Sequence, residues 1–417
     1  MYKHTKPLIP VAFIAVISWI GIPATAADVM HARVSFDAGG TLVRGTEDSD
    51  WSHATLNSII LPGDTLWVTE GGTTELEMAG GTFLRMADAS KVELTALPPD
   101  AALRAWTGSI YIQRLSRSTG TLMIETPACK IEVPKDAAVR IDMVEQGSTT
   151  VSVHWGQVTV RTDGDAPQTL AERQRVYVDP GLLPSAPMPF DVGSRDDFDI
   201  WNSDRAKILA TGETRATTPI PATETTLGVS DLNTYGEWVV VENRQYWRPT
   251  VVADYIPYRY GHWSFVYGTG YCWVDSYPFA YVTSHYGRWS YFPSYGWCWG
   301  YDPVWSPAWV ATVRYGPNFC WTPVDFYNRP VVVGAGATFN IGGVAFSFGA
   351  STFVPQTQLF YGANYVAPLQ PAVIQNIDQT NINIWNININ TDRPLVKVPY
   401  TDTKLAVFKE SPKTILR

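Results

Sequence analysis

Four residues in one aromatic stretch have types and spacing that could bind a sugar. Trp297, Trp299 and Tyr301 alternate along the chain, so a strand would place their rings on one face, and Arg288 lies shortly before them. Such rings present an apolar face with a polar edge, which suits stacking on glycans or peptidoglycan. If the rings are exposed, this is a glycan site with Arg288 as a polar partner. If they are covered, they pack a sheet that lacks a thick core, and both interpretations stay open.

Groups that commonly carry catalysis are dispersed along the chain. The six histidines are scattered, and no zinc-protease, serine-hydrolase, phosphate-loop or dinucleotide motif is present. Two carboxylates of the aromatic stretch could form a glycosidase pair, but nothing in their spacing singles out two of them. The candidates are Glu237, Glu242, Asp254, Asp275, Asp302 and Asp325. We therefore expect a protein that is not an enzyme and that has no cofactor and no metal site.

The aromatic residues belong to a repeat over residues 234–327. Ten of the 17 Trp and 14 of the 21 Tyr lie between positions 235 and 321, in a segment without lysine. A unit of about 26 residues recurs there, in which Tyr-Gly-x-Trp is followed by a strand that ends in aromatic-Cys-Trp. Each unit is predicted to form a two-stranded hairpin with one aromatic face, and the units to form an array. The motifs are Tyr235–Trp238, Tyr260–Trp263 and Tyr286–Trp289, then Tyr271–Trp273, Trp297–Trp299 and Phe319–Trp321.

Three of the four cysteines occupy equivalent places in these units. If another strand lies between them, Cys272, Cys298 and Cys320 are about 10 Å apart, whereas a disulfide needs Cα atoms within about 7 Å. Small buried core residues are therefore favoured, with one bridged pair as the alternative, and no histidine accompanies them at metal-ligand spacing. Cys129 lies on the apolar face of an earlier strand and is expected in a core.

Residues 30–180 alternate apolar and polar side chains with a period of two, which is typical of half-buried strands. In the first hairpin, Leu76 lies on the apolar face and Glu75 on the opposite one. A three-residue loop sets Leu76 opposite Leu84 and Glu75 opposite Arg85, whereas a two-residue loop would mix the faces. We predict the three-residue loop.

Two further hairpins are predicted in the same region. One joins residues 129–133 to residues 139–143 through Pro134-Lys135-Asp136, with Arg140 and Asp142 outside. The other turns at Gly156-Gln157 and has Val151, Val153, Trp155, Val158 and Val160 on its apolar face.

The order of motifs in residues 30–180 resembles the FecR-like periplasmic family. The residues that carry the resemblance are Ile60–Leu66, Glu75-Leu76, Thr82–Arg85, Thr126-Pro127 and the segment Val151–Val160. The resemblance implies a β-rich domain of the cell envelope, a sandwich or a roll. The best-known member relays a siderophore signal to a cytoplasmic sigma-factor system through a transmembrane helix and a cytoplasmic segment. Neither is recognised here, so that role is not carried over.

A helix over 190–210 and a linker over 211–233 are predicted after this domain. Ser194 is a suitable N-cap, and the acidic residues that follow it suit a helix start. Richness in Thr, Ala and Pro indicates that the linker is flexible. The C-terminal segment, residues 328–417, is rich in Gly, Asn and Ile, and residues 381–390 are predicted to contain a strand. The helical stripe comprises Phe198, Trp201, Arg205, Ile208 and Leu209.

Residues 1–26 have the pattern of a secretory signal peptide. A basic head precedes an apolar stretch over residues 8–22, and Ala24-Thr25-Ala26 fits cleavage after Ala26. An uncleaved anchor would need about 20 apolar residues, and Pro10 interrupts this shorter stretch. No later stretch is long and apolar enough to span a membrane. We expect a protein of the periplasm or a secreted one, not integral to the membrane.

The aromatic region resembles an uncharacterised family of bacterial exported proteins with Tyr-Gly-Arg-Trp and Gly-Trp-x-Trp repeats. His285–Trp289 and Ser306–Val310 carry this resemblance. The formal net charge of −8 argues against a nucleic-acid partner. We predict a mainly β, exported, non-catalytic envelope protein that acts as an interaction or structural module for a protein partner. A glycan- or peptidoglycan-binding module is the alternative, and a periplasmic signalling component related to FecR-type regulation is the second.

Overall fold

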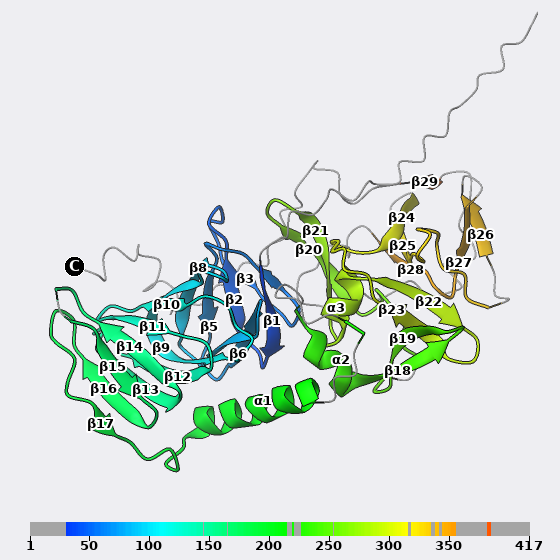
Figure 1. Ribbon diagram of the computed structural model, residues 1–417. Helices are drawn as coiled ribbons and strands as arrows, with labels where there is room; N and C mark the ends of the chain where they lie inside the picture. Colours follow the sequence, from blue (N-terminus) through cyan, green and yellow to red (C-terminus); the bar gives the residue numbers. More distant parts are fainter. Residues whose placement is uncertain are drawn as a thin grey trace, which may run out of the picture.

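The computed structural model describes residues 31–355 and 382–384, apart from positions 145, 165, 215–218, 221–226, 253, 316–317, 335–337 and 342–343. The fold is mainly β, as predicted. Helix α1 (Asp197–Thr214) runs along the N-terminal β domain, and its C-terminal end lies near the C-terminal aromatic domain (Figure 1). The predicted signal peptide, residues 1–26, lies outside the described residues. In the part of the chain that is described, no helix has the length and apolarity needed to cross a membrane.

The β domain consists of two sheets that share strand β9 (Ala102–Arg114). Residues 102–107 of β9 pair in sheet B and residues 108–114 in sheet A. Neighbouring strands are antiparallel, except that β9 and β10 run parallel. Sheet A contains β4 (Ile59–Ile60), β1 (Ala32–Asp37), β6 (Thr74–Met78), β7 (Thr82–Met86), β9, β12 (Ala137–Met143), β13 (Thr149–Trp155), β16 (Gln174–Val178) and β17 (Met188–Pro189). Sheet B contains β3 (Ser52–His53), β2 (Thr41–Arg44), β5 (Thr65–Val68), β8 (Lys91–Ala96), β9, β10 (Leu122–Glu125), β11 (Lys130–Val133), β14 (Gln157–Arg161) and β15 (Gln168–Ala171).

Gly108 lies where β9 passes from one sheet to the other. Its φ is +85°, and a Cβ at this position would lie 2.5 Å from the Cα atom of Ser90. A side chain therefore has no room at this crossing, and the left-handed backbone favours glycine. The inward-facing side chains of both sheets form one apolar core, in which Leu76, Leu84 and Ile112 are fully buried.

The register of the first hairpin is confirmed, and the other two predicted hairpins are wrong. Leu76 pairs with Leu84 and Glu75 with Arg85 across a three-residue loop. By contrast, β11 and β14 pair with each other in sheet B, while β12 and β13 pair in sheet A. The segments predicted as hairpin turns are corners between sheets, and Trp155, which was expected on the apolar face, is 55% exposed. Alternation shows which face a strand buries, but it does not identify the neighbouring strand.

Helix α1 begins and ends later than the predicted range of 190–210. Its N-cap is Asp196 and not Ser194, because the Asp199 N–H donates to Asp196 Oδ1 at 2.8 Å. The predicted linker, residues 211–233, overlaps the end of α1 and most of α2 (Val229–Tyr235). Trp201 is half-buried and Ile208 is 41% exposed, so both lie beside the buried stripe. That stripe comprises Phe198, Asn202, Arg205 and Leu209.

The aromatic domain contains four hairpins, which confirms the predicted repeat. Two of them join through β19 and β23 into a four-stranded sheet, and helix α3 (Ala280–His285) lies between the second and third hairpins. The C-terminal segment contributes strands too, and β29 pairs with β24, as expected for a strand within 381–390. The strands are β18 (Gly236–Val241), β19 (Arg244–Pro249), β20 (Gly261–Val266), β21 (Gly270–Asp275), β22 (Arg288–Phe292), β23 (Gly296–Gly300), β24 (Val310–Tyr315), β25 (Asn318–Pro323), β26 (Thr338–Ile341), β27 (Val344–Ser347), β28 (Thr352–Pro355) and β29 (Ile382–Ile384).

One tryptophan occupies the same place on the second strand of every hairpin. These four side chains, at positions 247, 273, 299 and 321, are at most 1% exposed. Three of the indole N–H groups donate to backbone carbonyls that precede the hairpin, at 2.7–2.9 Å: Trp247 to Leu232, Trp299 to Tyr286 and Trp321 to Tyr258. The exception is Trp273, whose indole donates to Asp275 Oδ2 at 3.0 Å. The repeat thus supplies a buried ring and a hydrogen-bond partner for its polar edge.

Arg33 on β1 joins the β domain to the aromatic domain. Its guanidinium is almost fully buried and donates to Glu77 Oε2 at 2.7 Å and to Asn57 Oδ1 at 3.0 Å within the β domain. From the other side it pairs with Asp231 of α2 and donates to the carbonyl oxygen of Pro278 at 3.2 Å. Because removing one partner of a buried ion pair is strongly destabilising, this cluster fixes the contact between the domains.

A second contact across the same joint involves Asn57 and Asp275. The Asn57 side-chain amide donates to the carbonyl oxygens of Asp275 and Tyr277 at 2.9 and 2.7 Å. The Asp275 carboxylate is buried and accepts from the Trp273 indole and from the Tyr277 N–H at 3.1 Å. Burial raises the pKa of Asp275 from 3.8 to about 7, because these hydrogen bonds only partly offset the loss of solvation.

All four cysteines are buried free thiols, which confirms the predicted core role. Burial raises the pKa of Cys129 and of Cys298 to about 11. We expect a thiol reagent at pH 8 to leave the native protein unmodified and to label four cysteines after unfolding in urea without a reductant. Mass spectrometry of the two samples measures this. Labelling of only two cysteines in urea would instead show a disulfide.

The joint predicts a pH-dependent stability. Because the folded pKa of Asp275 is raised, the folded chain keeps a proton between about pH 4 and 7 that the unfolded chain has lost, so stability falls as the pH rises through this window. Relative to Asp275→Asn, we expect the wild type to lose about 1–3 kcal/mol of unfolding free energy between pH 5 and pH 8. Urea titrations of both proteins at these two pH values measure it, and equal pH dependence would contradict the prediction.

Candidate functional site

A row of mostly polar side chains crosses the outer face of sheet A from β1 to β16. Cross-strand pairing places one residue of each of seven neighbouring strands in this row. We call it the charged row, and its members are Phe36, Glu75, Arg85, Tyr111, Arg140, Ser152 and Arg175.

Helix α1 lies across the strands and supplies partners to three members of the charged row. Arg205 pairs with Glu75 at 2.6 Å, and the Asn202 carbonyl accepts from Arg85 at 3.5 Å. One turn earlier, Asp199 pairs with Arg140 at 3.0 Å. Three residues advance a helix by about 4.5 Å, which is close to the strand separation of about 4.8 Å. The helix therefore meets Glu75 and Arg85, which lie on neighbouring strands, from positions three residues apart, while Tyr111 of β9 lies between Arg85 and Arg140 in the row.

Glu75 is the buried centre of this contact. Its carboxylate is fully buried and pairs with Arg85 Nε and Arg205 Nη2, each at 2.6 Å, while Ser35 Oγ donates at 2.7 Å. Burial alone would raise the pKa of Glu75, but the charges and hydrogen bonds of the two guanidinium groups outweigh it and lower the pKa to about 2. The carboxylate is therefore charged at every physiological pH.

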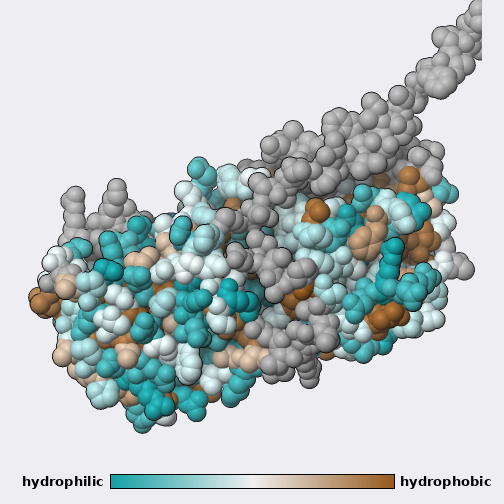
Figure 2. Space-filling view, viewed as in Figure 1, coloured by the Kyte–Doolittle hydropathy of each residue, from teal (hydrophilic) through white to brown (hydrophobic). Residues whose placement is uncertain are grey.

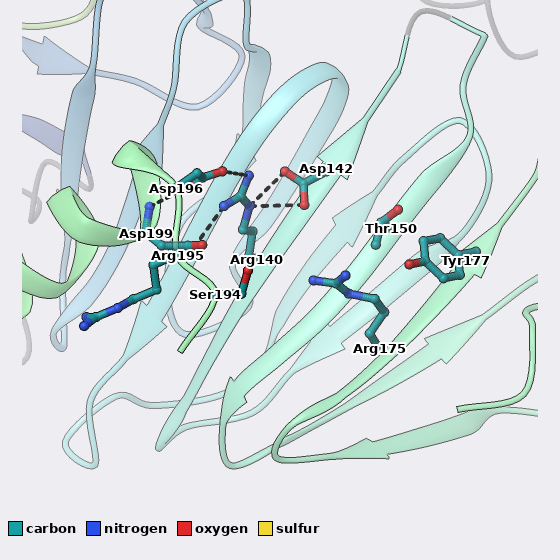
Figure 3. A pocket seen from close by; sticks show the side chains of 9 residues that line it. All are labelled: Arg140, Asp142, Thr150, Arg175, Tyr177, Ser194, Arg195, Asp196 and Asp199. Carbon is teal, nitrogen blue, oxygen red and sulfur yellow. Dashed lines mark hydrogen bonds and ion pairs between the residues drawn. The ribbon is translucent and has the colours of Figure 1, made fainter. Parts of the chain in front are cut away.

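The charged row extends beyond α1, and its uncovered end forms a polar groove of about 480 Å³. Figure 3 shows that the groove lies between the start of α1 and strands β12, β13 and β16. Figure 2 shows that hydrophobic residues are scattered over the visible face of the β domain and form no continuous patch. The lining residues are Arg140, Asp142, Thr150, Arg175, Tyr177, Ser194, Arg195, Asp196 and Asp199.

Three arginines line the groove, and the two that belong to the charged row, Arg140 and Arg175, have different partners. Arg140 pairs with Asp142, Asp196 and Asp199 at 2.8–3.0 Å. Burial lowers the pKa of Arg140, but the three carboxylates outweigh that effect and raise it. Arg175 instead donates through Nε to Ser152 Oγ at 2.9 Å. Among the residues that the structure describes, no carboxylate lies within ion-pair distance of Arg175.

The four residues expected to bind a glycan lie together in the aromatic domain, but three of them are buried. Trp299 is fully buried, and Trp297 and Arg288 are 7% and 8% exposed. Tyr301 is half-buried and packs edge-on against Trp299. These rings are therefore largely covered, which agrees with the packing interpretation of the two that the sequence left open, and the segment before the third hairpin accepts the Trp299 indole hydrogen bond through the Tyr286 carbonyl. Glycan binding here stays a prediction and would require the rings to become exposed.

Arg288 is likewise committed to contacts within the domain. It donates to the carbonyl oxygen of Gly287 at 2.9 Å and to Asn328 Oδ1 at 3.2 Å. Its guanidinium also lies over the Trp309 ring, 3.0 Å from the ring centroid. These contacts indicate a packing role in the described conformation.

Sequence reasoning missed the charged row, although one signal was present. Glu75 opposite Arg85 was predicted, and so was the outward direction of Arg140 and Asp142. The outward face was taken to be solvated, whereas Glu75, Glu77 and Arg85 are at most 4% exposed. Opposite charges at directly paired positions of neighbouring strands were the available clue that something covers this face.

The charged row predicts how α1 is held. We expect Glu75→Gln to lower the unfolding free energy by about 2–4 kcal/mol at pH 7, because two guanidinium groups lose their buried carboxylate. Since the folded pKa of Glu75 is depressed, its stabilisation is present above about pH 4.5 and is lost as the pH falls toward 2. Calorimetry at pH 7 and pH 3 measures both effects. Glu132→Gln, which alters an exposed pair with Arg161, is the control and should change little.

Comparisons with known proteins add a family for part of the chain. Residues 229–328, from α2 to just beyond β25, match a family of unknown function (DUF6600). No curated protein sequence matches the chain. Two crystal structures of a proposed anti-sigma factor from Parabacteroides distasonis ATCC 8503, at 1.65 Å and 2.50 Å resolution, are distantly similar. Both are 12% identical with a TM-score of 0.29, cover 45% of this chain, and are themselves covered to 99% and 98%. A likeness of this size defines no function.

Proposed function

We propose that this protein is an exported, non-catalytic component of the cell envelope that binds a protein partner through the uncovered end of the charged row. The observation that carries the proposal is that part of the charged row already binds another segment of this chain, helix α1. Glu75, Arg85 and Arg140 are each met by a side chain or carbonyl of α1, whereas Arg175 and the groove beside it are left open. A face that already holds one polypeptide segment by charge is suited to hold another.

Export is supported by the sequence of residues 1–26 and by the resemblance of residues 30–180 to FecR-like periplasmic domains. A non-catalytic role is supported by the pKa values and the structural contacts of the buried titratable groups. Burial lowers the pKa of His285 to about 3 and of His262 to about 4, so neither is poised to transfer protons at neutral pH. Asp275 holds the Trp273 indole at the joint between the domains.

Export can be tested by fractionating cells that produce the tagged full-length chain. We expect the protein in the periplasm or the medium with its N-terminus at position 27, because the apolar stretch directs secretion and Ala24-Thr25-Ala26 is cleaved. A variant without residues 2–26 should stay in the cytoplasm. Peptide mass spectrometry of the N-terminus gives the readout, and an intact N-terminus in the cytoplasmic fraction would refute export.

Partner binding can be tested by photo-crosslinking in intact cells. A photoreactive amino acid replaces Tyr177, which lines the groove and is 46% exposed. Tyr295, in the turn between β22 and β23, is 39% exposed and provides a matched control on the other domain. We expect a protein adduct from position 177 and a much weaker one from position 295. Equal labelling from both positions, or none from position 177, would exclude the groove as the binding site.

A further inference from the structure

The chemistry of the partner follows from the residue at the open end of the charged row. We propose that Arg175 binds a carboxylate side chain presented by a peptide segment of the partner, an inference that rests on the proposed function. Cross-strand pairing places Arg140 next to Ser152 and Ser152 next to Arg175. The two arginines therefore lie two strands apart on one face, about 10 Å from each other.

Arg175 is held in a defined position by contacts that leave one edge of its guanidinium available. Its Nε donates to the buried Ser152 Oγ at 2.9 Å, and its Cζ lies 4.7 Å from the centroid of the Phe190 ring. These two contacts restrain the side chain before any ligand arrives. Figure 3 shows its terminal nitrogens directed into the space between Arg140 and Thr150. A restrained guanidinium loses little conformational freedom when it forms paired hydrogen bonds with a carboxylate.

The same face already shows what kind of group it accepts. Arg140 binds Asp196, the N-cap of α1, and Asp199 in its first turn at 2.8 and 3.0 Å, so the chain itself supplies carboxylates from a peptide segment to an arginine of this row. Arg175 is the next arginine along the row and lies beyond the reach of the helix. A partner segment that lies beside the start of α1 would place an Asp or Glu on Arg175 as α1 does on Arg140.

The other lining groups favour a peptide over phosphate or nucleic acid. Asp142, Asp196 and Asp199 line the groove together with Arg175. Their charges would repel a dianionic phosphate, whereas a single carboxylate is repelled less. The same carboxylates, with the hydroxyls of Thr150 and Ser194, can accept backbone N–H groups of a bound segment. The groove thus combines the restrained cation of Arg175, with Arg195 also in its lining, and several acceptors, which matches an acidic residue within a peptide.

The direct test uses the purified mature protein and a capped, fluorescent peptide that contains glutamates. The control peptide has the same sequence with every glutamate replaced by glutamine. We expect anisotropy to show binding of the glutamate peptide and at least about tenfold weaker binding of the glutamine peptide. Arg175→Gln should weaken binding of the glutamate peptide by a similar factor. Arg175→Lys should retain part of it, because the charge remains and the paired geometry is lost. Arg161→Gln, an exposed arginine of sheet B, is the control and should bind as the wild type does.

Competition and crosslinking separate this inference from the proposed function. Inorganic phosphate should displace the peptide poorly, and phosphate binding stronger than peptide binding would overturn the inference. In cells, the adduct from position 177 should map to a segment that contains Asp or Glu and should disappear in Arg175→Gln. An adduct that persists in this variant, or maps to a segment without acids, overturns the carboxylate but leaves partner binding intact. The absence of any adduct at position 177 overturns both.

Discussion

Buried charges on the outer face of sheet A are the constraint on which the arrangement of the whole molecule depends. A charged side chain that leaves water must find opposite charge or hydrogen-bond partners, because breaking a buried pair costs about 3–5 kcal/mol. Arg33 and Glu75 face away from the apolar core of the β domain, so that core cannot satisfy them. Their partners come from α2 and α1. The positions of the helix and of the aromatic domain therefore follow from charges placed on two adjacent strands.

Ion pairs of this kind add specificity more than net stability, because well-packed apolar residues of similar volume often stabilise as much or more. We infer that specificity is what α1 requires. An apolar stripe could slide along the sheet, whereas Asp199, Asn202 and Arg205 match Arg140, Arg85 and Glu75 in only one register. A shift by one turn would bring Asn202 toward Arg140 and leave Glu75 without Arg205. The charged row thus sets both the direction and the position of the helix.

Local features of the β domain could be predicted from the sequence, and long-range features could not. The pairing of Leu76 with Leu84 follows from a short loop and from alternation, which are both local. The same alternation in residues 129–160 is compatible with hairpins and with strands that alternate between two sheets, and the second arrangement is the one observed. In α1 the capping residue was placed two positions early, because Ser194 and Asp196 are both good caps. The groove combines residues 140–199 from four elements, so no single motif could indicate it.

In the aromatic domain, a buried tryptophan that recurs in each unit helps to hold the hairpins together. Its four hairpins are divided among three sheets, so backbone pairing alone does not hold the domain together, and buried indoles pack between the hairpins. Each indole N–H must be satisfied, and in three units a backbone carbonyl accepts it. The repeat was visible in the sequence, but the segments that cover it were not, which is why the sequence left open whether Trp297 and Trp299 are exposed or packed.

The one departure from this repeat coincides with the joint between the domains. In the second unit a carboxylate, Asp275, takes the place of the backbone carbonyl as the acceptor for Trp273. The carbonyl oxygens of Asp275 and Tyr277 accept the side-chain amide of Asn57 from the β domain instead. A side-chain acceptor thus satisfies the indole while the main chain of the same turn binds the neighbouring domain. The buried carboxylate costs solvation free energy, as its raised pKa shows. We infer that this cost is offset because Asp275 has two roles: its side chain binds the indole of its own hairpin, and its main chain binds the neighbouring domain.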